Sequence, residues 1–157
     1  MKTKNSSSTS RHIKASAEKI FTAITDPALL VKWQVPGDMT ARLHHYDLRE
    51  GGGYEMSLFY PPGDSKAHGK TNDKEDRFAA KFIEIVAAKK IVESIRFQSE
   101  DPLFQGEVVL EILLTPDING TAVTFNFTNI PPGIDPKDND AGTKSSLEKL
   151  AHLVESH

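Results

Sequence analysis

The stretch DPKDNDAGTKSSLEKLAHLV, residues 135–154, predicts one long helix late in the chain. Asp135 is a favoured N-cap residue, and Pro136 is tolerated at the first helical position because its missing N–H would find no partner there. Apolar residues then recur at helical spacing, namely Leu147, Leu150, Ala151 and Val154. A helix over about 136–156 spans roughly 30 Å, so it needs an apolar surface of similar length to pack against.

The residues before this helix predict that surface, because their apolar period changes to two, as in strands. Six strands are expected, near Thr40–Leu48, Tyr54–Tyr60, Phe78–Val86, Ile91–Gln98, Gly106–Thr115 and Thr121–Thr128. Short turns join most of them, and Asn119-Gly120 is a strong hairpin signal, so we expect an antiparallel meander. Pro61–Lys74 is expected to be a polar loop, and Ser6–Lys14 a further, polar strand near the sheet edge.

Two short helices are predicted between the first strand and the meander. Ser16 caps one helix, Asp26 caps the next, and Pro36-Gly37 ends the second. This order predicts an α+β domain, in which a curved antiparallel sheet of about six to seven strands grips the long C-terminal helix. Residues 10–157 are expected to form a single domain, with residues 1–10 as a flexible or edge-strand N-terminus.

Such a geometry predicts an internal cavity, since one helix cannot fill the concave side of the sheet. The apolar candidates for its walls are Trp33, Met56, Leu58, Phe82, Phe97, Val108, Leu110, Phe125, Leu147 and Leu150. The alternative is that most of them are plain core, because alternating apolar strand residues are buried with or without a ligand. Trp33, by the expected mouth, and Met56, with an adaptable side chain, are the stronger cavity candidates.

The composition excludes several classes of function. The chain has 157 residues, a net charge of −3 and no cysteine, so disulfides, catalytic thiolates and thiolate-held zinc are excluded. A nucleic-acid partner is not expected, because nucleic-acid-binding domains carry a basic patch. No segment approaches the roughly 18 apolar residues of a membrane helix, so we expect no membrane insertion and a cytoplasmic location.

No motif for a cofactor or a metal ion is found. The segment GDSKAHGKT, residues 63–71, departs from a phosphate-binding loop, because Asp64 stands where a glycine is required and would repel phosphate. His44 and His45 are adjacent on a predicted strand and therefore point to opposite faces. Three aspartates, Asp135, Asp138 and Asp140, lack the spacing of a calcium loop and are explained by helix capping.

Two carboxylates, Glu84 and Glu93, are candidates for catalytic groups. Glu93 shares the apolar face of its strand with Ile91 and Ile95, and Glu84 shares a face with Phe82. If these faces line the cavity, desolvation raises the carboxyl pKa and permits acid–base chemistry. The alternative, which we favour, is that the phase differs or that a β-bulge lets the carboxylates reach water.

The chain resembles the START-like helix-grip superfamily (SRPBCC), and within it the branch named for the activator of heat-shock protein 90 ATPase (AHSA). Five segments, in this order, carry the resemblance: Ser16–Trp33 (SAEKIFTAITDPALLVKW), Asp47–Tyr54 (DLREGGGY), Phe82–Ile95 (FIEIVAAKKIVESI), Gly120–Phe125 (GTAVTF) and Gly142–Val154 (GTKSSLEKLAHLV). The stretch Ile130–Gly142 (IPPGIDPKDNDAG) is similar to a bacterial subgroup with a single domain.

The resemblance implies the fold more closely than the function. The superfamily includes co-chaperones and binders of lipids or polyketides, so three functions stay open. These are binding of a small apolar ligand, stimulation of a chaperone ATPase, and a cyclase- or hydrolase-type reaction that uses Glu84 or Glu93. Thr143 stands where the family often has Trp, which leaves the size of the cavity open.

Overall fold

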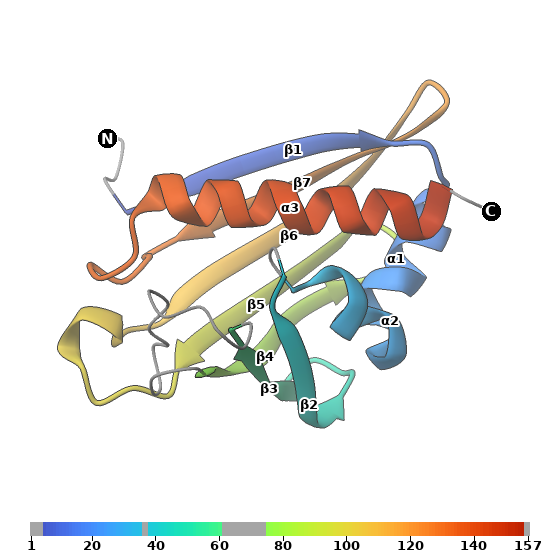
Figure 1. Ribbon diagram of the computed structural model, residues 1–157. Coiled ribbons are helices and arrows are strands. Elements are labelled where there is room, and N and C mark those ends of the chain that lie inside the picture. The colour runs from blue at the N-terminus through green and yellow to red at the C-terminus, as the bar shows by residue number, and fades with distance from the viewer. Residues whose placement is uncertain (1–4, 36–37, 61–74, 156–157) are drawn as a thin grey trace.

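The computed structural model describes residues 5–35, 38–60 and 75–155 of the chain (Figure 1). In chain order the elements are β1 (Ser7–Ile13), α1 (Ala17–Thr25), α2 (Pro27–Trp33), β2 (Thr40–Asp47), β3 (Gly53–Phe59), β4 (Glu75–Val86), β5 (Lys90–Phe97), the short 3₁₀ helix η1 (Pro102–Phe104), β6 (Val108–Asp117), β7 (Gly120–Thr128) and α3 (Pro136–Glu155). The predicted helix stop at Pro36-Gly37 and the predicted loop at Pro61–Lys74 lie outside the described residues.

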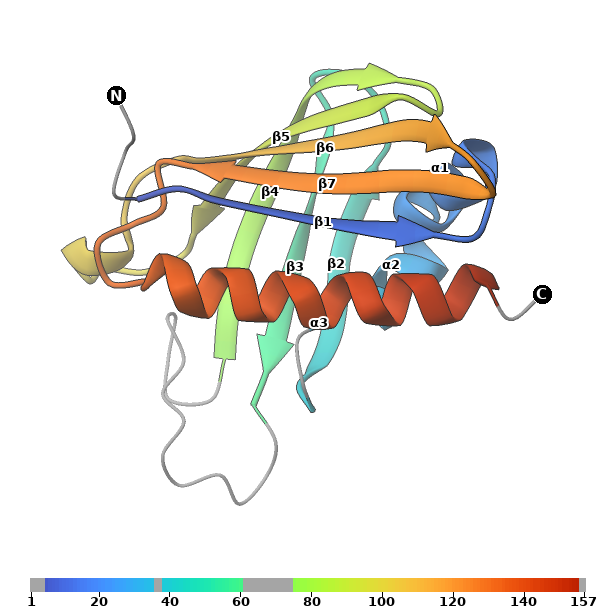
Figure 2. The same ribbon diagram turned by 90° about the horizontal axis from the view of Figure 1, so that it is seen from above.

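The seven strands form one antiparallel sheet in the order β1-β7-β6-β5-β4-β3-β2. Neighbours from β2 to β7 are consecutive in the chain, as expected for a meander, and β1 lies at the edge of the sheet beside β7. The sheet is strongly bent, and α3 lies across its concave side (Figures 1 and 2). The predicted α+β helix-grip architecture is therefore confirmed.

The two short helices follow each other without a connecting loop, because one residue serves both. Ser16 begins α1, and its side-chain oxygen accepts a hydrogen bond from the Lys19 N–H over 3.1 Å. Asp26 ends α1 and caps α2, accepting from the Ala28 N–H over 2.9 Å. This arrangement turns α2 sharply against α1, and the pair closes one end of the bent sheet (Figure 1).

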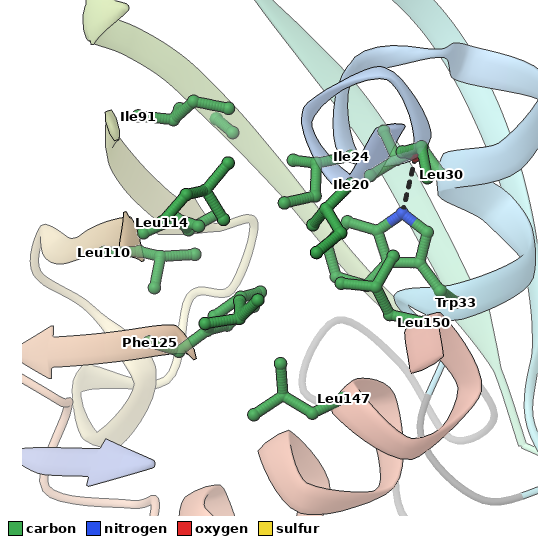
Figure 3. Packing of buried hydrophobic residues seen from close by; sticks show 14 of the residues in the cluster. Ile20, Ile24, Leu30, Trp33, Ile91, Leu110, Leu114, Phe125, Leu147 and Leu150 are labelled. Carbon is green, nitrogen blue, oxygen red and sulfur yellow. Dashed lines mark hydrogen bonds between the residues drawn. The ribbon is translucent and has the colours of Figure 1, made fainter. Parts of the chain in front are cut away.

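The core lies where α1, α2 and the C-terminal part of α3 meet the sheet (Figure 3). Trp33 is 1% exposed and donates its indole N–H to the Ala23 carbonyl oxygen over 3.0 Å, so its polar atom is satisfied. Leu150 lies beside Trp33 and Ile20 in the same cluster. The core thus packs α1 and α2 against the C-terminal part of α3. The N-terminal part of α3 lies outside this group of contacts.

The element boundaries agree with the sequence to within a few residues, with one addition. The structure has η1, which the sequence did not predict, and Asp101 caps it by accepting from the Leu103 N–H over 3.0 Å. The Gly133 N–H also donates to the Leu103 carbonyl oxygen over 2.6 Å, which ties η1 to the approach to α3. None of the described helices has both the length and the apolar character needed to cross a bilayer.

Candidate functional site

A pocket of about 290 Å³ lies between the sheet, the residues after α2 and the N-terminal half of α3. Its apolar lining consists of Trp33, Met39, Leu58, Phe78, Ile95, Phe97, Leu110, Phe125, Phe127 and Ile134. Its polar lining consists of Gln34, Tyr60, Asp76, Asp138, Asn139, Thr143 and Ser146. Aromatic side chains therefore make up much of the wall, and its polar groups lie on α3, at Gln34 next to Trp33, and at Tyr60 and Asp76 on the sheet side.

The strands deliver their lining residues by simple alternation. Phe125 and Phe127 on β7, and Ile95 and Phe97 on β5, are two residues apart and so point to the same face of the sheet. Some of these rings contact each other edge to face. The centroids of Trp33 and Phe125 are 5.9 Å apart at an interplanar angle of 82°. Such contacts hold the aromatic wall in a defined shape.

Half of the eight principal cavity candidates line this pocket: Trp33, Leu58, Phe97 and Phe125. Of the two further candidates, Leu110 lines it and Val108 lies in the core. The structure places the other four of the eight in the core as well: Met56, Phe82, Leu147 and Leu150.

Leu147 and Leu150 miss the pocket because α1 and α2 pack against the C-terminal half of α3. The helix reaches the pocket with an earlier part of the same face, through Asn139, Gly142, Thr143 and Ser146. Thr143 is 6% exposed and donates its hydroxyl hydrogen to the Asn139 carbonyl oxygen over 2.8 Å. A side chain larger than threonine at this position would project into the pocket.

Glu84 does not share a face with Phe82, so the hypothesis of a catalytic Glu84 in the cavity is wrong. The structure agrees with the alternative that the sequence analysis favoured, a β-bulge that lets this carboxylate reach water. A β-bulge lies between the two, because Phe82 pairs with Glu93 whereas Glu84 pairs with the adjacent residue, Val92. The extra residue shifts the phase, so Glu84 reaches the outer face, where its side chain is 44% exposed and lies 3.0 Å from the Lys90 ammonium.

Glu93 lies on the inner face and is 4% exposed, so for this residue the favoured alternative, that the carboxylate reaches water, is wrong. Burial raises the pKa of its carboxyl group from 4.5 to about 7, although a hydrogen bond from Tyr54 opposes the shift. The Tyr54 hydroxyl donates to Glu93 Oε1 over 3.0 Å. Neither residue is part of the pocket lining, so the carboxylate lies behind the wall of the pocket and not in it.

Gln34 connects this buried pair to the pocket. Its Nε2 donates to the Tyr54 hydroxyl oxygen over 3.0 Å, and Gln34 itself belongs to the lining. The chain Gln34–Tyr54–Glu93 was missed by sequence reasoning, because hydrophobic periodicity marks apolar faces and gives no signal for a lone amide at a helix end. Its one trace in the sequence is that Gln34 directly follows the buried Trp33.

Within the described residues, His, Asp and Glu side chains nowhere gather in a group of three or more that could hold a metal ion. Asp135 and Asp138 act at the start of α3, where Asp135 accepts from the Lys137 N–H over 2.9 Å. His44, on the exposed side of β2, lies 2.8 Å from the Ser57 hydroxyl through its Nε2. The side chains that line the pocket are hydrogen-bonding groups and aromatic or aliphatic groups.

Comparison with known proteins places this geometry in a family. The family described as "Activator of Hsp90 ATPase homolog 1-like protein" matches residues 14–155. No curated protein matches the chain.

Solved structures with the same fold come from several bacteria. A protein from Chromobacterium violaceum is 26% identical, with a TM-score of 0.83 over 96% of this chain and 98% of that one. A protein from Nitrosomonas europaea is 19% identical, with a TM-score of 0.73 over 99% of this chain and 97% of that one. The AHSA1-like protein from Aeromonas hydrophila is 18% identical, with a TM-score of 0.70 over 96% and 92%. The last two show a common fold alone.

Proposed function

The chain belongs to the family of activator of Hsp90 ATPase homolog 1-like proteins, and on that premise we propose that it binds a small, largely apolar ligand between α3 and the sheet. One observation carries the proposal, namely the pocket of about 290 Å³ with its aromatic wall. Ligand sites in proteins are concave, mostly apolar and furnished with a few polar groups that fix orientation, and this pocket matches that description. A lipid-like or polyketide-like compound is the class of ligand that such a wall would accept.

The packing of the pocket wall supports a ligand site and not a plain core filled by side chains. The ring centroids of Phe78 and Phe97 lie 6.2 Å apart at 62°, and Trp33 is held by its hydrogen bond to Ala23. Side chains fixed in this way lose little further freedom when a ligand enters, so less of the binding free energy is spent on ordering them. An apolar ligand would gain from the contact area without rearranging the sheet.

The proposal is tested by titrating the full chain with 2-methylnaphthalene, an uncharged aromatic probe, and following methyl groups by NMR. We expect saturable binding with shift changes at Leu58, Ile95 and Leu110, which line the pocket, and none at Ile118, which is 86% exposed in the β6–β7 hairpin. Mass spectrometry of the protein purified from cells would identify a natural ligand. Absence of saturable binding, or shifts spread evenly over the surface, would contradict the proposal.

The family description favours a second candidate, in which the domain contacts a chaperone and stimulates its ATPase. Measurement of the ATPase rate of a bacterial heat-shock protein 90 with increasing amounts of the chain tests it directly. A rate that stays constant, together with no complex on size-exclusion chromatography, would remove this candidate without touching the first.

A cyclase- or hydrolase-type activity has less support from the geometry. Glu84 forms an ion pair with Lys90 on the outer face, and Glu93 is buried in a hydrogen bond with Tyr54, which itself does not line the pocket. A general acid or base has to lie within hydrogen-bond reach of the reacting atom, directly or through one water. Neither carboxylate is among the residues that line the pocket.

A further inference from the structure

The hydroxyl groups in the pocket wall already donate their hydrogen atoms inside the protein. Tyr60 donates to Asp76 over 2.9 Å, Thr143 to the Asn139 carbonyl oxygen over 2.8 Å, and Ser146 to the Gln34 carbonyl oxygen over 3.3 Å. A hydroxyl has a single hydrogen to give. In the described part of the wall, these three groups can therefore offer a ligand lone pairs but no hydrogen atom.

Gln34 adds an acceptor that the protein leaves unused. Its Oε1 is buried and has no hydrogen-bond partner among the described residues. Tyr54 and Glu93 fix the orientation of the Gln34 amide. The Tyr54 hydroxyl donates its hydrogen to Glu93, so its oxygen accepts from Gln34 Nε2 and not from Oε1. A buried acceptor without a partner costs free energy, which a donor supplied by a bound molecule would recover.

The charges near the pocket have one sign in the described structure. Asp76, which is 2% exposed, and Asp138, at the start of α3, both line it, and no Lys, Arg or His does so within the described residues. Asp76 has partners within the protein, whereas the Asp138 carboxylate repels an anion and places no penalty on a neutral hydroxyl. An acidic ligand such as a fatty acid would thus meet both like charge and acceptors that cannot pair with it.

We propose that the pocket selects an uncharged aromatic ligand that carries a hydrogen-bond donor, with Gln34 Oε1 as the acceptor, and that it discriminates against carboxylates. This inference rests on the proposed function and adds to it the chemical class of the ligand. A phenolic hydroxyl on a fused aromatic ring satisfies the three features together. The ring packs on Phe97 and Phe125, the hydroxyl donates to the amide, and no negative charge approaches Asp138.

The test compares three probes of similar size by calorimetric titration of the full chain: 2-naphthol, 2-methylnaphthalene and 2-naphthoate. The titrations are done at about pH 8, above the pKa of Glu93, so that Tyr54 donates to the carboxylate. We expect 2-naphthol to bind about tenfold more tightly than 2-methylnaphthalene, the scale of one hydrogen bond to a buried acceptor. We expect 2-naphthoate to bind more weakly than both.

Two variants assign the effect to one atom. Gln34→Met keeps the length of the side chain and removes the acceptor, so it should lose the preference for 2-naphthol and retain the affinity for 2-methylnaphthalene. Ile118→Ala changes an exposed residue of the β6–β7 hairpin that lies outside the pocket lining and leaves the Gln34 side chain in place, so it should keep the preference. The comparison of probes on the unaltered chain stands even if a variant fails to fold.

The outcomes separate this inference from the proposed function. Equal binding of 2-naphthol and 2-methylnaphthalene would overturn the inference and leave ligand binding intact. Binding of 2-naphthoate as tight as that of 2-naphthol would overturn the discrimination against acids. A preference that survives in Gln34→Met would overturn the assignment to Gln34. Binding of none of the three would overturn the proposed function and the inference with it.

Discussion

The Tyr54 hydroxyl donates a 3.0 Å hydrogen bond to the Glu93 carboxylate in the interior of the domain, where the two residues are 2% and 4% exposed. The bond stabilises the ionised carboxylate, but burial outweighs it, so the pKa of Glu93 rises from 4.5 to about 7. A carboxyl group with a raised pKa in the folded state makes stability depend on pH in a direction that can be measured.

The free energy of unfolding should fall as the pH rises through the range set by Glu93. Between about 4.5 and 7 the folded protein holds a proton that the unfolded chain has released, so stability is lost as the pH rises. The difference in pKa corresponds to at most about 3 kcal/mol. Urea unfolding at several pH values, on the unaltered chain and on Glu93→Gln, measures it. Glu84→Gln, an exposed control, should leave the slope unchanged, whereas equal slopes for all three would contradict the role of Glu93.

Tyr54→Phe should raise the pKa of Glu93 further, because the hydrogen bond from Tyr54 is the contact that lowers it. The change also removes the acceptor for Gln34 Nε2, so we expect a loss of stability of about 1–2 kcal/mol. NMR titration of the Glu93 carboxyl carbon gives the pKa directly. Tyr46→Phe serves as the control, since Tyr46 donates to the Thr25 carbonyl oxygen and not to Glu93. A pKa that stays at its original value in Tyr54→Phe would refute this reading of the pair.

Thr143→Trp should fill the pocket from the α3 side and weaken the binding of 2-methylnaphthalene by at least about tenfold. Thr143 is buried and lines the pocket, so a larger side chain at this position would occupy pocket volume. Glu148→Trp adds the same side chain to the exposed side of the same helix and should leave affinity unchanged. Calorimetry with both variants, after a check of folding by circular dichroism, decides the matter. Full affinity in Thr143→Trp would place the binding site elsewhere.

Trp33 should report directly on occupancy of the pocket. It is the single tryptophan of the chain, is 1% exposed and lies in the pocket wall. We expect iodobenzene, an apolar heavy-atom quencher, to reduce its fluorescence in a saturable way. Aqueous iodide should leave it almost unchanged, since a hydrated anion cannot reach a buried ring. Quenching by iodide with none by iodobenzene would show that Trp33 faces solvent and not a ligand site.

The fold was predictable from the sequence because its signals are periodic and mutually consistent. Leu147 and Leu150 mark the buried face of α3, and the two-residue period with short turns marks the meander. Ser16 and Asp26 mark the starts of α1 and α2, and both act as caps in the structure. Each of these signals acts over a few residues, which is the range in which a single sequence is informative.

The site was predictable only in part, because it depends on what lies opposite each residue. Helical spacing places Thr143, Ser146 and Leu147 on one side of α3, but only the packed position of α1 and α2 decides which of them border the pocket. The bulge between Phe82 and Glu84 changes which face of the sheet the following residues occupy, and no residue type in this segment marks its position. Sequence therefore identifies buried faces, while tertiary contacts decide where along those faces a space remains.

The pairing of β1 with β7 sets the order in which the domain can be completed during synthesis. Ser7 lies opposite Phe127, and Ile13 lies opposite Thr121, so β1 pairs with a strand that comes far later in the sequence. Contacts between such distant residues form slowly, because the entropy cost of closing a long loop precedes the free energy gained from the contacts. β1 therefore has no partner strand until β7 has been synthesised. The serines, threonine, arginine and histidine of β1 leave this segment with a single large apolar side chain, Ile13, while β7 is absent.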